Sequence, residues 1–156
     1  MTVNICIGHA EISPRDQDDL DDEMNIVVEV IERDDEVPFS LGIWESNRLD
    51  YNYSFLENFC REVGILDIFF CVYVNGDGSE NHVELYGYPG VKWLSDNTLR
   101  SFKNALNSYQ AKYPDIKIQD EITSDTVKVY LHILTWLVYW SERALRDAKR
   151  PGIEIS

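Results

Sequence analysis

Residues 127–140 read VKVYLHILTWLVYW, and this most apolar run of the chain decides the fold class because it predicts a buried helix. One set of apolar side chains repeats at helical spacing: Val127, Tyr130, Leu131, Leu134, Leu137 and Val138. A second set covers much of the remaining circumference: Val129, Ile133, Trp136 and Trp140. A helix that is apolar around most of its circumference is buried on more than one side, either within its own chain or in a homodimer.

The residues on either side of this run indicate where the helix begins and ends. Ser124 or Asp125 can cap its first turn, and the helix is expected to end near Lys149, before Pro151. Acidic residues precede its start and basic residues occupy its last turns, which suits the helix dipole. The sequence therefore predicts a long apolar C-terminal helix.

Two further helices are predicted upstream of this run. Ser54 and Glu57 have the spacing of a capping box and precede an apolar face that ends at Gly64. Ser95 can cap a second helix that carries a single apolar stripe to about Lys112.

Strands are predicted where β-branched and aromatic residues gather: residues 3–7 or as far as 12, 24–31, 39–44, 65–74 and 82–88. The last two are joined by the turn residues 75–81, which predicts a hairpin. Residues 116–118 form a short edge strand or are merely extended. We therefore expect an α+β fold, with a mainly antiparallel sheet of about five strands packed with three helices, in a single domain over residues 1–156.

The chain is strongly acidic, with a formal net charge of −14. Twelve carboxylates lie between Glu11 and Glu36, and only Arg15 and Arg33 oppose them. Such a charge repels nucleic acid and anionic membranes and favours a basic partner protein. The same run of acidic residues is also typical of a solvated loop that binds no partner. The expected contact residues are Asp16, Asp18, Asp19, Asp21, Asp22, Glu23, Asp34, Asp35 and Glu36.

The cysteines and the first residues indicate a cytoplasmic protein. Cys6, Cys60 and Cys71 are few, widely spaced and set in apolar stretches, which is typical of reduced thiols. The chain begins without the basic region of a signal peptide. Residues 127–140 contain charged and polar side chains and are shorter than the ~20 residues of a membrane span, so no membrane association is expected.

Metal and catalytic motifs give little support for an enzyme. Residues 75–81 imitate the alternating oxygens of a calcium loop, but Glu80 stands where that loop needs glycine. No histidine or cysteine pair has zinc-ligand spacing, and we expect no cofactor. Cys60 could act as a nucleophile only if His82 or His132 lay beside it in space, and no local signature indicates this.

These observations favour an acidic, non-enzymatic binding protein that neutralises or inhibits a basic partner, such as an immunity protein against a toxin. One alternative is a DNA mimic that inhibits a nucleic-acid-binding protein, although the uneven distribution of charge weakens it. Another alternative is an enzyme of unmarked type with a cleft between sheet and helices. Aromatic residues in or beside predicted loops could anchor a partner or pack at the edge of the core: Trp44, Tyr51, Tyr53, Tyr86, Tyr88 and Trp93.

Overall fold

Strand β1 (Thr2–Pro14) organises the main sheet, because it pairs with three other strands along its length. Its residues 2–6 pair with β3 (Arg48–Asn52), residues 5–9 with β7 (Pro151–Ile155) and residues 10–14 with β2 (Ile26–Val30). Strand β6 (Gly90–Trp93) pairs with the other edge of β7. All these pairings are antiparallel. This computed structural model describes residues 2–14, 26–30, 46–85, 90–116 and 125–156.

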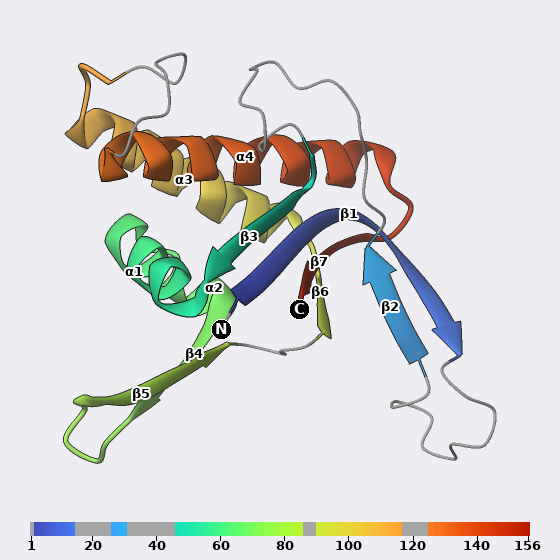
Figure 1. Ribbon diagram of the computed structural model, residues 1–156, viewed down its shortest axis with the longest axis horizontal. Coiled ribbons are helices and arrows are strands. Elements are labelled where there is room, and N and C mark those ends of the chain that lie inside the picture. The colour runs from blue at the N-terminus through green and yellow to red at the C-terminus, as the bar shows by residue number, and fades with distance from the viewer. Residues whose placement is uncertain (1, 15–25, 31–45, 86–89, 117–124) are drawn as a thin grey trace.

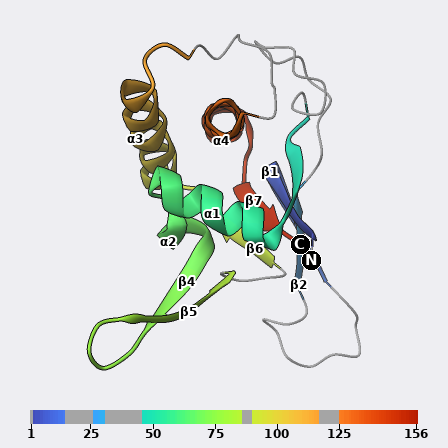
Figure 2. The same cartoon turned by 60° about the vertical axis from the view of Figure 1, so that its left-hand side comes forward.

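A second, two-stranded sheet is formed by β4 (Phe70–Val74) and β5 (Glu80–Leu85). Figures 1 and 2 both show this hairpin, which we call the arm, projecting away from the helices and the main sheet. The predicted hairpin is confirmed, with Phe70 opposite Leu85 at its base and Tyr73 opposite His82 farther out.

The helices are α1 (Tyr53–Val63), the short α2 (Leu66–Phe69), α3 (Asp96–Lys112) and α4 (Thr126–Asp147). Figure 2 views α4 end-on, with α3 on one side and the strands of the main sheet on the other. The α+β class, the three longer helices and the mainly antiparallel pairing are therefore confirmed.

The core explains why α4 is apolar around most of its circumference. Leu134 and Trp136 are fully buried on this helix, and the alternate β1 residues Val3, Ile5 and Ile7 belong to the same cluster. That cluster extends from β1 through all four helices to β7. Packing between α3 and the sheet thus buries α4 on two sides within one chain.

The residues that cap the starts of α3 and α4, and the glycine that ends α1, are those that the sequence predicted. The Ser95 hydroxyl accepts a hydrogen bond from the Thr98 amide, and the Asp125 carboxylate accepts one from the Val127 amide. Gly64, predicted to follow the first helix, has φ of 82°, a left-handed conformation that favours glycine.

The predicted start of the first helix is wrong by two residues. Asn52 caps α1, because its side-chain oxygen accepts a hydrogen bond from the Phe55 amide at 2.7 Å. Ser54 lies inside the first turn, so the capping box that it was expected to form with Glu57 is not the cap. Asn52 also ends β3, so the same residue closes the strand and starts the helix.

The predicted strand over residues 65–74 is also wrong in its first half. Residues Leu66–Phe69 form α2, whose Ile68 and Phe69 are buried in the core, and the strand begins only at Phe70. The left-handed Gly64 reverses the chain, and one helical turn directs two consecutive side chains inward where a strand would alternate them.

Strands β3, β6 and β7 were not predicted, whereas β1 and β2 were. Strand β7 packs tightly at Gly152, where an added Cβ would lie 3.0 Å from Val91 Cγ1 and 3.2 Å from Ala10 Cβ. The predicted strand at 39–44, and residues 117–118 of the segment 116–118, lie outside the described residues. Within the described ranges, no helix has both the length and the hydropathy that crossing a membrane requires.

Candidate functional site

The nine acidic residues predicted to contact a partner lie outside the described residues: Asp16, Asp18, Asp19, Asp21, Asp22, Glu23, Asp34, Asp35 and Glu36. The described ranges hold 15 carboxylates and 11 Lys or Arg residues, a net charge of −4, so −10 of the total −14 belongs to the remaining segments. Pro14 pairs with Ile26, so the most acidic segment, 15–25, joins the paired ends of β1 and β2.

The arm exposes an apolar face that continues from the core. At its base Phe70 and Leu85 are buried, and alternation along the strands places Val72, Val74 and Val83 on the same face. Val83 is partly buried, whereas Val72 and Val74 are 40% and 64% exposed. We call Val72, Val74 and Val83 the valine strip, a surface that leaves the core and remains open to solvent.

The opposite face of the arm is aromatic and acidic. Tyr73 stacks on His82, with ring centroids 4.4 Å apart, and its hydroxyl donates to Glu84 at 3.4 Å. The nearby Glu84 carboxylate raises the pKa of Tyr73 above its ordinary value. Glu84 also lies 3.4 Å from His82 Nε2, an ion pair when the imidazole is protonated.

Three contacts join the arm to α1. The Tyr53 ring packs edge-on against Phe70, with centroids 5.5 Å apart, and its hydroxyl donates to the Val83 carbonyl at 3.2 Å. Arg61 of α1 forms a bidentate ion pair with Glu80 of β5. The Tyr53 contacts hold the inner part of the arm, and Arg61 reaches Glu80, which lies opposite Val74 at the outer end. Val72, Tyr73 and Val74 nevertheless stay exposed.

The polar residues of the turn, whose spacing resembles that of a calcium loop, hydrogen-bond one another instead. Asn75 N–H donates to the Ser79 carbonyl at 2.7 Å, and Ser79 N–H donates to Asp77 Oδ1 at 2.9 Å. Hydrogen bonds from Ser79 hold the pKa of Asp77 below its usual value. Across the described residues, no three histidine, cysteine or carboxylate side chains gather as a metal site.

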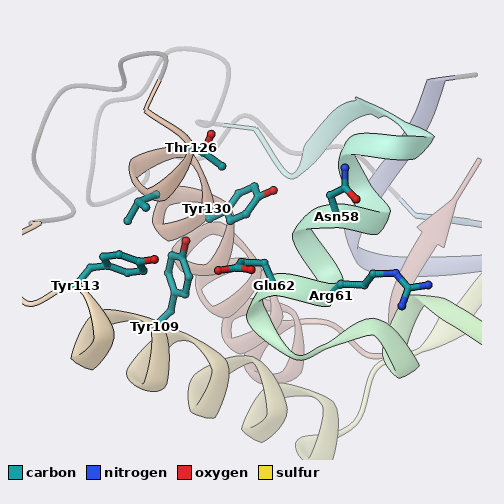
Figure 3. A pocket seen from close by; sticks show the side chains of 8 residues that line it. Asn58, Arg61, Glu62, Tyr109, Tyr113, Thr126 and Tyr130 are labelled. Atoms are coloured by element: carbon teal, nitrogen blue, oxygen red, sulfur yellow. The ribbon is translucent and has the colours of Figure 1, made fainter.

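A pocket of about 480 Å³ lies between α1, the end of α3 and the start of α4. Figure 3 shows its lining: Asn58, Arg61, Glu62, Tyr109, Tyr113, Thr126, Val127 and Tyr130. The Tyr109 ring lies 5.0 Å from Tyr113 and 6.2 Å from Tyr130, measured between centroids. The Glu62 carboxylate points toward these rings, whereas the Arg61 guanidinium points away from them (Figure 3).

The hydroxyls of Tyr109 and Tyr130 in this pocket stay protonated at neutral pH. Burial raises the pKa of Tyr109, and its neighbours Tyr113 and Glu62 raise it further. Burial also raises the pKa of Tyr130, and the Glu62 carboxylate adds to the effect. A protonated phenol offers one donor and one acceptor, so these side chains can orient a polar ligand.

The cysteine and histidine residues considered for catalysis lie in different settings. Cys60 is fully buried, and burial raises the pKa of its thiol, which opposes formation of the nucleophilic thiolate. His132 is buried in the core, and His82 is exposed on the arm. Cys6, Cys60 and Cys71 form no disulfide with one another, and Cys71 on the arm is partly exposed.

The aromatic side chains expected near loops divide between packing and exposure. Tyr51 stacks on Phe55 at 4.5 Å and packs against the core, as does Tyr53. Trp93 is 50% exposed. Trp44, Tyr86 and Tyr88 lie outside the described residues.

Sequence reasoning missed both Tyr73 and the tyrosines of the pocket as surface features, because they lie in segments expected to pack. Alternating apolar residues through the end of β4 were the available signal for the arm, since they continue beyond the point where the core ends.

No family model matches the chain, and the comparison with curated proteins and with solved structures yields no match.

Proposed function

We propose that this protein is a binding module that neutralises or inhibits a basic partner protein in the cytoplasm, as an immunity protein does for its toxin. The observation that carries the proposal is the arm, whose valine strip is exposed beside carboxylates. An isolated two-stranded hairpin is marginally stable in water, so an arm that projects with an apolar face uncovered favours a bound state in which that face is covered.

The composition of the arm fits a cationic partner. Apolar and aromatic anchors surrounded by charge are typical of protein interfaces, in which a few buried side chains supply most of the binding energy. The carboxylates of the arm are Asp77 at the turn, Glu80, which pairs with Arg61, and Glu84 on the face opposite the valine strip, and all three are exposed. The net charge of −14 would add long-range attraction and accelerate association with a basic protein.

The first experiment is capture of the partner from nuclease-treated host lysate at low and high salt, followed by mass spectrometry. We expect a basic protein, recovered in stoichiometric amount and released by salt. Binding is then measured with the purified partner, using V72S/V74S to remove the exposed part of the valine strip. Losing two interface anchors should weaken binding by about 30-fold or more.

Two further variants separate the arm from the other surfaces. W93S removes a comparably exposed apolar side chain from β6, outside the arm, and should leave the affinity unchanged. D18N/D19N/D21N/D22N should slow association and flatten its salt dependence while dissociation changes little. Unchanged affinity of V72S/V74S would contradict a role for the arm, and recovery of only the protein itself would contradict the proposed partner.

A further inference from the structure

The tyrosine-lined pocket has a defined electrostatic character, which follows from the pairing of its charged groups. Arg61 is already held by two carboxylates, Glu80 through two hydrogen bonds and Glu57 at 3.2 Å. Lys112 lies 3.5 Å from Glu62. Counted with these partners, the charged lining residues carry a net charge of −1.

Among the described residues at the pocket, the remaining source of positive potential is the start of α4. The amides of a helix N-terminus attract anions when they are open. Here the Asp125 carboxylate accepts the Val127 amide at 2.9 Å, and the same carboxylate contributes to the raised pKa of Tyr109. Each positive feature that the described residues place at the pocket therefore has a carboxylate beside it, and an anionic ligand is disfavoured.

One contact within the chain indicates which ligand chemistry suits the lining of the pocket. The Lys112 ammonium lies 5.5 Å from the centroid of the Tyr113 ring while it faces Glu62. A cation of the chain itself thus uses an aromatic face and a carboxylate of the lining together. Lys112 and Glu62 are 60% and 45% exposed, so this internal pair is weak and can be displaced.

We propose that this pocket binds the guanidinium group of an arginine side chain presented by the basic partner. A guanidinium is planar, stacks on aromatic faces and forms bidentate hydrogen bonds with a carboxylate, all of which the tyrosine rings and Glu62 provide. Tyr109 and Tyr130 add phenol oxygens that accept hydrogen bonds. The identity of the ligand's source rests on the proposed function, whereas the cation specificity rests on the pocket alone.

The test uses the full chain with ring-labelled tyrosine and follows the tyrosine NMR signals during titration with acetyl-arginine amide. Acetyl-citrulline amide, which keeps the shape but lacks the charge, and acetyl-glutamate amide serve as matched probes. We expect the arginine probe to shift pocket tyrosine signals with Kd on the order of 1 mM, the range for so small a ligand, and the other probes to bind at least tenfold more weakly.

Variants then locate the binding. E62Q should weaken binding of the arginine probe about fivefold, and Y113L, which removes a half-buried ring at the rim, about threefold. K112M removes the internal competitor and should tighten binding about threefold. K103M is its matched control, because Lys103 is also on α3 but pairs with Glu142 of α4, away from the pocket lining, and the variant changes the net charge equally. It should leave the Kd unchanged.

Equal binding of the arginine and citrulline probes, preference for the glutamate probe, or equal effects of K112M and K103M would overturn the proposal. Spermidine binding without binding of the arginine probe would also overturn it and assign the pocket to a free polyamine. These titrations need no partner, so they can fail while V72S/V74S still weakens partner capture. Conversely, a bound arginine probe without a basic partner would refute only the proposed function.

Discussion

Two buried tryptophans on α4 allow one hydrogen bond to be measured against a matched control. Trp136 and Trp140 are one turn apart, and their exposed fractions are 0% and 1%. Trp136 Nε1 donates to the Ser46 carbonyl at 2.7 Å, whereas Trp140 Nε1 is buried without a hydrogen-bond partner among the described residues. We predict that W136F destabilises the fold more than W140F does.

The difference in the free energy of unfolding follows from one cost that both substitutions share and one that only W136F carries. Each replaces an indole by a smaller ring in the core, which costs about 1–2 kcal/mol in lost contacts and residual cavity. W136F also leaves the Ser46 carbonyl unpaired, which adds about 1–2 kcal/mol because that group is only partly buried. W140F removes an indole N–H that was buried without a partner, and phenylalanine keeps an aromatic face for Arg143, 5.7 Å away.

The assay is urea unfolding followed by far-UV circular dichroism, since tryptophan fluorescence would itself change in these variants. The free energy of unfolding of W136F should lie about 1–2 kcal/mol below that of W140F, with equal denaturant slopes. Equal losses, or a larger loss for W140F, would refute the assignment of the hydrogen bond as the difference between the two sites.

Three further predictions test the local structure. N52A should lower the free energy of unfolding by about 1 kcal/mol and S54A by much less, since Asn52 caps α1; equal effects in urea unfolding would restore the capping box. G64A should cost about 1 kcal/mol in the same assay, because the φ of 82° strains any side chain, and a neutral result would contradict that conformation. Iodoacetamide at pH 8 should modify Cys71 and spare Cys60 in the native protein, since burial raises the pKa of the Cys60 thiol; mass spectrometry showing both modified would refute its burial.

Much of the fold could be predicted where local signals and packing agree. The apolar circumference of residues 127–140 predicted a helix buried on two sides, and α4 lies between α3 and the sheet. Ser95 and Gly64 marked helix ends because their preferences arise within one or two turns of the backbone. The hairpin of β4 and β5 was predictable because its turn chemistry is local as well.

Short strands could not be predicted, because their partners are distant in the chain. Strand β7 pairs with β1 and β6, which are far from it in the chain, and Gly152 lets Val91 and Ala10 approach closely there, which no local pattern shows. Asn52 was not recognised as a cap because β3, the strand that it closes, was itself not predicted.

By itself, the sequence determined the α+β class, the three longer helices and a net charge of −14, since composition and periodicity are properties of the residues alone. Only the tertiary structure decided which of the apolar residues stay outside the core. The valine strip has the same alternation as a buried strand, and it is exposed because the arm extends past the body that would cover it. The tyrosines of the pocket also come together only in the tertiary structure, because α3 and α4 bring them together beside α1. Burial there, with Glu62 as a neighbour, raises the pKa of Tyr109 and Tyr130.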